Sequence, residues 1–429
     1  MGRQPREISL RYYKIKQPFA TQHMRFLRLC LSRYTGKAQS LRRLSHYRGP
    51  ANRDSEPDLL TWIRGFLLQR SVFGRKAEMV SKSAVVLVIG MMGMVYHATQ
   101  IAPSVSDDES DEVSADSSSP RIRLSDGRRL AYVEKGVPKE EAVYKIIVVH
   151  GFGSSKEMTF LAPSELVEKL GIYILHFDRA GYGESDPNPE RTVKSEANDI
   201  EELADQLGLG SKFYVIGVSM GSYPIWSCLK HIPHRLSGAA LIVPVVNYRW
   251  PSLPQSLIRE DHRRKLVQLG LWLSKYAPGV LHWTVTQQWF RSPSVLEKNP
   301  VFFSANDIEI LKKIPGFRML SQGKLREKEV FDTLRYDFMV GFGDWDFDPT
   351  SMVNPFPENG SNVHIWQGLE DRVVPVKLQR YISGKLPWIR YHEVPGGGHL
   401  IVHYNGLCEA VLKALLLGEE PATYDHMRP

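Results

Sequence analysis

The chain is poor in cysteine, with only Cys30, Cys228 and Cys408 among its 429 residues. Three scattered thiols exclude a disulfide framework and a thiolate metal site, and they leave the redox compartment open. With 42% hydrophobic and 24% charged residues, the composition is that of a folded protein. Wholesale disorder, a collagen-like repeat and a membrane protein with many spans are therefore excluded.

Acidic residues are absent from Ile8 to Arg53, where Lys and Arg recur throughout. Residues 1–80 carry 17 Lys and Arg against 5 Asp and Glu, a net charge of +12. Because the whole chain has a formal charge of +8, the remainder has a net charge of −4. The basic extension at 1–80 is either a targeting segment for a mitochondrion or chloroplast or a disordered tail. We expect no nucleic-acid partner.

Charged residues are also lacking between Ser83 and Ser106, and Ala84–Tyr96 is the densely apolar part of this stretch. A helix needs about 20 residues to cross a bilayer, a length that is reached only by including the weaker HATQIA that follows. An acidic, Ser-rich linker at 103–120 comes next. An apolar run between a basic flank and an acidic linker favours a single membrane anchor over a buried core helix.

We therefore expect a hydrophobic segment at 81–102 that contacts a membrane through residues 84–101. The protein would be a single-pass protein of the endomembrane system, for example of the ER. Initiation at Met79 would instead make the apolar run resemble a signal anchor or a cleaved signal peptide.

From Arg121 onward, short β-branched runs alternate with helical patterns. The turn at Asp126-Gly127 predicts an opening hairpin. Continuous apolar runs suit strands that are covered on both faces, so we expect an α/β fold with a mostly parallel central sheet. The predicted strands are Lys145–Gly151, Ile172–Asp178, Phe213–Ser219, Gly238–Val246, Asn362–Gly368 and Ile389–Gly396.

The segment Gly217-Val218-Ser219-Met220-Gly221 matches the pattern G-x-S-x-G, between an apolar strand and the helical sequence SYPIWSCLKH. A strand, a sharp turn and a helix are the context that exposes a nucleophilic serine. Gly217 and Gly221 are expected there because so tight a turn leaves no room for side chains. We predict that Ser219 is the nucleophile.

A serine hydroxyl needs a base, and the base needs a carboxylate to orient it. Asp371 follows a predicted strand, and His399 follows the last one in a Gly-rich loop, which gives the order Ser, Asp, His. Glu370 and His403 are the competing acid and base. Asp371 is preferred because RVVP follows it, and His399 because a glycine loop suits an imidazole that must move.

The Gly-rich turn His150-Gly151-Phe152-Gly153 follows the strand KIIVV. Acyl transfer needs hydrogen-bond donors for the oxyanion, and such a turn aims a backbone N–H into the site. We assign the backbone N–H groups of Phe152 and Met220 to this role. His150 and Gly151 are expected to shape the turn without transferring protons.

Together, HGFGSS, FDRAGYGESD, GVSMGS, LEDRVVP and GGGH resemble an α/β-hydrolase fold enzyme of the AB hydrolase-1 type. The sequence is also similar to plant α/β-hydrolases with a hydrophobic segment before the catalytic domain, most clearly over TVKSEANDIEELADQLGLGSKFYVIG and IPHRLSGAALIVPVVNY. The resemblance covers about Arg121 to Leu417. Val218 stands where many lipase-like and esterase-like relatives have His, which leaves the nucleophile intact but weakens a claim to monoacylglycerol-lipase specificity. Ser219 stands where epoxide hydrolases and haloalkane dehalogenases carry Asp.

The chain between Val246 and Asn362 is far too long for a loop, and Leu266–Phe290 has Trp and Leu at helical spacing. The resemblance implies a helical cap at 248–361 that divides the hydrolase core into 121–247 and 362–418, with a tail at 419–429. An aromatic-lined cap implies a substrate with an apolar portion, but the aromatics also serve to pack cap against core.

Two further motifs fall within the same insertion. The acids of Gly341–Pro349 (GFGDWDFDP) are interpreted as a turn or cap rim, because no accompanying ligand pattern supports a metal site. Asn359-Gly360-Ser361 is a glycosylation sequon that has meaning only in a luminal domain.

The sequence thus predicts a serine hydrolase that cleaves a small-molecule or lipid carboxylic ester with an apolar portion, through an acyl-enzyme. Neither a cofactor nor a metal is expected. The alternatives are a hydroxynitrile lyase-like or perhydrolase-like enzyme, or a ligand receptor that retains the fold without hydrolysis.

Overall fold

The computed structural model describes residues 119–286, 302–314, 317–358, 362–421, 423–424 and 427–429. The chain divides into two compact units, Met1–Met79 and Val80–Pro429, and every described residue belongs to the second. The basic extension, the segment expected to contact a membrane and the sequon lie outside the described residues. No helix within the described ranges is long and apolar enough to cross a membrane.

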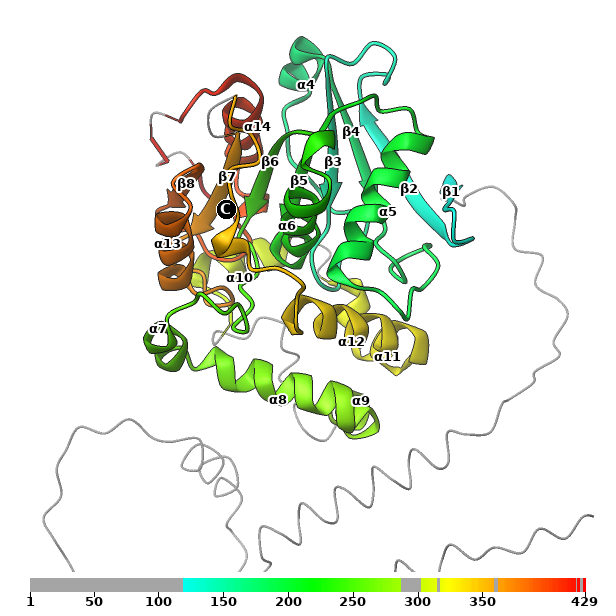
Figure 1. Ribbon diagram of the computed structural model, residues 1–429, viewed down its shortest axis with the longest axis vertical. Coiled ribbons are helices and arrows are strands. Elements are labelled where there is room, and N and C mark those ends of the chain that lie inside the picture. The colour runs from blue at the N-terminus through cyan, green and yellow to red at the C-terminus, as the bar shows by residue number, and fades with distance from the viewer. Residues whose placement is uncertain (1–118, 287–301, 315–316, 359–361, 422, 425–426) are drawn as a thin grey trace, which may run out of the picture. The chain divides into compact units, whose positions relative to one another are not determined.

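Eight strands form a sheet in the order β1-β2-β4-β3-β5-β6-β7-β8 (Figure 1). β1 and β2 form the predicted antiparallel hairpin, β2 also pairs antiparallel with β4, and all other pairs are parallel. The predicted mostly parallel sheet is thus confirmed. The strands are β1 (Arg121–Arg123), β2 (Arg129–Gly136), β3 (Tyr144–Val149), β4 (Ile172–Phe177), β5 (Phe213–Val218), β6 (Leu236–Ile242), β7 (Val363–Gly368) and β8 (Ile389–Val394).

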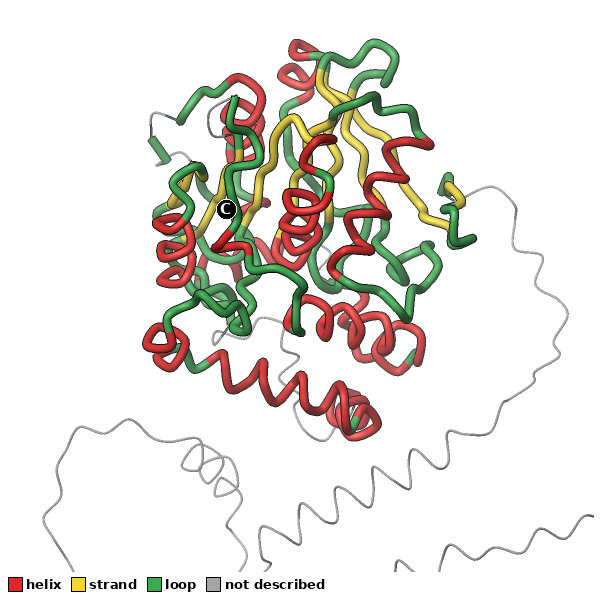
Figure 2. Tube along the Cα trace, in the orientation of Figure 1, coloured by secondary structure: helices red, strands yellow, loops and turns green. Residues whose placement is uncertain are grey.

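Helices cover both faces of the sheet, as the tube in Figure 2 shows. The helices are α4 (Ser164–Leu170), α5 (Val193–Gln206), α6 (Ser222–His231), α7 (Gln255–Glu260), α8 (Arg263–Tyr276), α9 (Pro278–Thr286), α10 (Ala305–Lys313), α11 (Gln322–Arg326), α12 (Lys328–Phe342), α13 (Val376–Lys385) and α14 (Leu407–Leu417). Short 3₁₀ turns lie at Ser219–Gly221, Pro233–Arg235, Arg318–Leu320, Pro349–Ser351 and Ile401–His403.

Successive residues of β3 serve two cores, because side chains alternate across a strand. Ile147 and Val149 belong to the cluster that includes residues of α5, α6 and α13. Ile146 and Val148 belong to the cluster that includes residues of α4, α10 and α14. Two buried faces explain why the sequence of β3 is continuously apolar rather than alternating.

The insertion between β6 and β7 forms helices α7 to α12. In Figure 1, α12 lies past the ends of the strands, and α8 lies on the far side of α12 from the sheet. α10 is anchored in the core, because Phe303 just before it and Ile310 within it are buried in the core cluster of β3, β7 and α14. Part of the insertion therefore packs as core and supports the site described next.

Candidate active site

Ser219 lies on a sharp turn between β5 and α6 and has the positive φ of 52°. A non-glycine residue in the left-handed region costs energy, and this conformation persists only because the surrounding structure imposes it. The flanking glycines make the turn possible. A Cβ at Gly217 would overlap the carbonyl of Gly221, and a Cβ at Gly221 would overlap the carbonyls of Val149 and His150.

The structure brings Ser219, His399 and Asp371 together. The Oγ of Ser219 lies 2.9 Å from Nε2 of His399, and Nδ1 of His399 lies 2.9 Å from Oδ2 of Asp371. Because the carboxylate only accepts, Nδ1–H donates to it, and Nε2 is left to accept the hydroxyl proton. Glu370 is exposed, and within the described residues the imidazole bonded to Ser219 is that of His399, not His403.

The turn after Asp371 holds its carboxylate in place. Oδ1 accepts hydrogen bonds from the backbone amides of Val373 and Val374, both at 2.8 Å. Oδ2 accepts from Nε2 of Gln367 at 3.0 Å in addition to His399. The two valine amides belong to the RVVP segment that follows the acid in the sequence.

Gly151 lies directly against the serine turn. A Cβ there would come 3.1 Å from the carbonyl oxygen of Val218 and 3.3 Å from Cβ of Ser219. The segment that carries the amide of Phe152 therefore lies beside Ser219, and Met220 is the next residue after Ser219 in the sequence. The assignment of these two amides to an oxyanion hole stays a prediction.

His150 is buried and bonds to the backbone on both sides of its ring. Nε2 accepts from the amide of Arg179 at 3.1 Å, so Nδ1 carries the proton that it donates to the carbonyl of Gly151 at 2.9 Å. Burial and the nearby charge of Arg179 hold the pKa of His150 well below its usual value. A neutral imidazole held in this way fits the role of shaping the turn that the sequence indicates, and that role stays a prediction.

Asp307, at the start of α10, was not identified from the sequence. Its carboxylate is buried and accepts hydrogen bonds from the backbone amides of His399 at 3.0 Å and Leu400 at 2.7 Å. It also forms the capping box of α10 with Ser304. The capping pattern in the sequence predicts that a helix starts here. It does not predict that Asp307 also holds the loop of His399, because that partner is 92 residues away.

These two carboxylates set the protonation of His399. Burial opposes the charged imidazolium, but the charge and hydrogen bond of Asp371 and the charge of Asp307 outweigh it and raise the pKa of His399. If His399 accepts the proton of Ser219, it must be neutral to do so, and kcat/KM for any ester substrate is then expected to fall as the pH drops through a pKa above the ordinary value of about 6.5.

Asp307→Asn removes one of these negative charges and is expected to move the acid limb of the pH profile to lower pH, with a lower plateau because the loop of His399 loosens. Profiles of kcat/KM from pH 5 to 9 measure both effects. Glu309→Gln, on the exposed face of the same helix, is the matched control. An acid limb at the same pH in Asp307→Asn and wild type would contradict this role.

A second buried network joins the insertion to the core. Asp337 of α12 and Arg179, both fully buried, form a two-pronged ion pair at 2.6 and 2.8 Å. The hydroxyls of Tyr182 and Tyr223 donate to the same carboxylate at 2.6 and 2.7 Å. Nε of Arg179 also donates to the carbonyl of His150 at 3.1 Å. The network therefore connects α12 to the turn beside Ser219.

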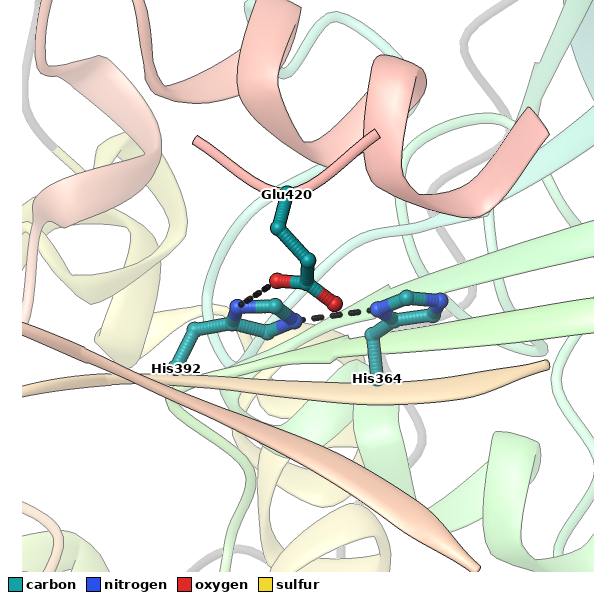
Figure 3. A group of neighbouring side chains, drawn as sticks. All are labelled: His364, His392 and Glu420. Carbon is teal, nitrogen blue, oxygen red and sulfur yellow. Dashed lines mark hydrogen bonds and ion pairs between the residues drawn. The ribbon is translucent and has the colours of Figure 1, made fainter. Parts of the chain in front are cut away.

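One group of side chains in the described residues has donor atoms close enough to suggest a metal ion: His364, His392 and Glu420 (Figure 3). Nδ1 of His364 and Nε2 of His392 are 3.0 Å apart, the ring centroids 5.3 Å and the planes within 10°. Each nitrogen thus points straight at the other, with room for a proton. Two imidazoles on a zinc ion each lie about 2.0–2.1 Å from it, which requires the rings to separate.

This group is instead a hydrogen-bonded chain. Nδ1 of His392 lies 3.2 Å from both the Glu420 carboxylate and the Tyr424 hydroxyl, and its Nε2 shares a hydrogen bond with Nδ1 of His364. Burial is the main cause that lowers the pKa of His364 to about 3 and of His392 to about 4. Two neutral histidines in a chain need no ion between them.

The acids of the GFGDWDFDP segment have separate partners. Asp344 pairs with Arg249 at 2.6 Å, Asp346 with His231 at 3.4 Å, and Asp348 accepts from the amide of Thr350 at 2.9 Å. Their carboxylates thus bind separate partners and do not converge on one point, as expected for acids of a turn.

A mostly parallel sheet with a serine on a strained turn after β5, hydrogen-bonded to a histidine and an aspartate from later loops, defines the hydrolase class of α/β proteins. The chain belongs to the alpha/beta hydrolase fold family, whose model matches residues 144–405. The predicted fold class is confirmed. No curated protein matches the chain.

The chain is similar to several solved structures at low sequence identity. The α/β-hydrolase MGS-M2 from a Medee basin deep-sea metagenome library is 14% identical, with a TM-score of 0.50 over 71% of this chain and 100% of that one. An esterase from Exiguobacterium antarcticum is 17% identical, with a TM-score of 0.49 over 70% and 99%. A thermophilic esterase from Thermogutta terrifontis is 20% identical, with a TM-score of 0.44 over 66% and 92%.

Proposed function

We propose that this protein is a serine hydrolase that cleaves a carboxylic ester with an apolar portion. The observation that carries the proposal is the continuous chain of hydrogen bonds from Ser219 through His399 to Asp371, with both links at 2.9 Å. The strained φ of Ser219 supports it, because strain of this kind concentrates at functional sites.

In this mechanism, Oγ of Ser219 attacks the ester carbonyl while Nε2 of His399 takes the hydroxyl proton. Asp371 stabilises the imidazolium, and the amides of Phe152 and Met220 bind the oxyanion. The imidazolium returns the proton to the departing alcohol, which leaves an acyl group on Ser219. Water, deprotonated by His399, then releases the carboxylic acid and restores the serine.

Apolar side chains next to the nucleophile support an apolar portion of the substrate. Met220 lies in a buried cluster with Tyr223 and Val245, against which Phe152 and Phe342 pack partly exposed. A Cβ at Gly341 would come 2.6 Å from Cε of Met220, so α12 reaches the residue beside Ser219. The clearest test of substrate is a series of p-nitrophenyl esters graded by acyl length.

A fluorophosphonate probe tests the hydrolase itself. The probe reacts with an activated serine, so we expect the folded full chain to be labelled and Asp371→Asn to be labelled much more slowly. An unlabelled folded protein would instead favour a ligand receptor. Labelling without turnover of any ester would favour lyase-like or perhydrolase-like chemistry, which uses the same three side chains.

We also propose that residues 84–101 anchor the protein in a membrane, with the endomembrane system as its location and a mitochondrion or chloroplast as the alternative. The support is the charge-free apolar stretch between a basic flank and an acidic linker. Full-length protein in the pellet after a carbonate wash is the expected result. Recovery in the washed supernatant would overturn the proposal.

A further inference from the structure

Large apolar side chains are exposed along one face of α8. Leu266, Leu269, Trp272 and Tyr276 are 47%, 54%, 55% and 66% exposed. Their spacing of three and four residues places them on one side of the helix. Trp272 and Tyr276 are neighbours, with ring centroids 6.1 Å apart. Such a stripe on an outer helix marks an interaction surface rather than scattered exposure.

The opposite face of α8 is the one that packs against the protein. A Cβ at Gly270 would meet the ring of Phe338 on α12 at 3.0 Å, and Arg335 of α12 donates to the carbonyl of Ser274 at 3.1 Å. Figure 1 shows α8 on the side of α12 that faces away from the sheet. Gly270 and Ser274 thus face α12, and the exposed side chains of Leu266, Leu269 and Trp272 point away from it.

The charged residues of α8 and α9 themselves have one sign. No Asp or Glu occurs from His262 to Thr286, while Lys265 and Lys275 flank the apolar residues. Both lysines are exposed, and neither forms an ion pair with any part of the chain that the structure describes. Helical spacing places Lys265 at the start of the stripe, four residues before Leu269, and Lys275 at its edge, three residues after Trp272. An amphipathic helix with Lys beside its Trp and Leu is typical of helices that lie in the interface of an anionic bilayer.

We propose that α8 docks on the surface of an anionic lipid bilayer, with Leu269 and Trp272 in the interface. Two other occupants fit less well. A second copy meeting this face across a two-fold axis would set lysines against lysines. The acidic linker at 107–116 matches the charge but offers Val113 as its single large apolar residue. A bilayer satisfies both the apolar stripe and the positive flanks.

An environment-sensitive dye at position 269 tests this docking in the full chain. Leu269→Cys in a Cys30→Ser background is labelled with a nitrobenzoxadiazole dye, since Cys228 and Cys408 are buried. We expect blue-shifted emission with phosphatidylcholine/phosphatidylserine vesicles and little shift with phosphatidylcholine alone. High salt should reduce the shift, because it screens exposed charges.

The matched control carries the dye at Val143→Cys, which is 72% exposed just before β3, at the end of the sheet away from Ser219. This dye should not respond to vesicles, even if residues 84–101 insert and bring the chain to the bilayer. Lys265→Gln with Lys275→Gln should remove the difference between the two vesicle types. The readout needs no enzyme activity, so it is independent of the proposed hydrolysis.

Three outcomes would overturn the proposal. An unchanged spectrum at position 269 in anionic vesicles means that α8 does not contact lipid. A blue shift without vesicles that grows with protein concentration means a second copy occupies the face. A blue shift without vesicles at all concentrations means that another segment of the same chain covers it.

Discussion

Replacing Ser219 by alanine is expected to lower kcat for ester hydrolysis by about a million-fold, the scale seen when an enzyme of this kind loses its nucleophile. Oγ of Ser219 is the atom that would form the covalent bond, and the methyl group of alanine cannot replace it. His399 and Asp371 would keep their own hydrogen bond of 2.9 Å but would have no hydroxyl to activate. Turnover of p-nitrophenyl esters by purified protein measures the loss.

The change at Ser219 should leave folding intact, which makes the kinetic result interpretable. Alanine meets the same backbone strain as serine at a φ of 52°, so stability should change little. Ser227→Ala is the matched control, because Ser227 is buried in α6 and its hydroxyl has no hydrogen-bond partner among the residues that the structure describes. Ser227→Ala should keep wild-type activity. Residual activity of Ser219→Ala above about one hundredth of wild type would place the nucleophile elsewhere.

Local signals in the sequence predict the sheet and the serine turn. Continuous apolar runs identify β3 to β7, because strands buried on both faces admit few polar residues. The pattern around Ser219 identifies its turn, since both flanking glycines are required by carbonyl groups that leave no room for a Cβ. Position after a strand also locates Asp371 and His399 near the same edge of the sheet.

The choice between Glu370 and Asp371 shows what a local signal cannot explain. The two acids are adjacent, and the sequence favours Asp371 only through the RVVP that follows. The structure supplies the physical reason, because the turn aims the amides of Val373 and Val374 at Oδ1 of Asp371. Glu370 is one residue earlier and its side chain is exposed.

The buried network around Arg179 was not predicted from the sequence, because its partners lie far apart along the chain. Arg179 and Asp337 are 158 residues apart, and Asp337 lies in an amphipathic helix where an acid ordinarily faces solvent. Trp345 lies in the segment interpreted as a turn or cap rim. Its ring centroid is 5.2 Å from that of Trp250, and it packs partly buried against the core. Periodicity locates such helices but does not tell which side chain meets which.

Asp337→Asn is expected to destabilise the fold by about 3–5 kcal/mol, because it leaves a buried charge without its partner. Arg179 would keep Glu196 at 3.8 Å as its remaining acid, and Arg191 already pairs with Glu196. Two guanidinium groups would then share one carboxylate away from water. Chemical denaturation at neutral pH measures the loss.

The pH of that measurement follows from the ionisation of Asp337. Burial opposes its charge, but Arg179 and Arg191 outweigh burial and lower the pKa of Asp337 below that of an unfolded aspartate, about 3.9. A depressed pKa contributes stability that is fully present above the unfolded value and is lost as the pH falls towards the folded one. The difference in unfolding free energy between wild type and Asp337→Asn should therefore be constant from pH 6 to 8 and should narrow below pH 4.

Asp332→Asn, on the same helix, is the matched control. Asp332 forms a partly exposed pair with Arg335 at 3.1 Å, and such pairs contribute about 1 kcal/mol or less. Asp337→Asn should also lower kcat/KM at temperatures where it is folded, because Arg179 holds the carbonyl of His150 in the turn beside Ser219. Equal stability of the two variants would mean that the buried pair does not stabilise the fold. Reduced stability with unchanged kcat/KM would mean that the network holds α12 against the core but does not affect the turn beside Ser219.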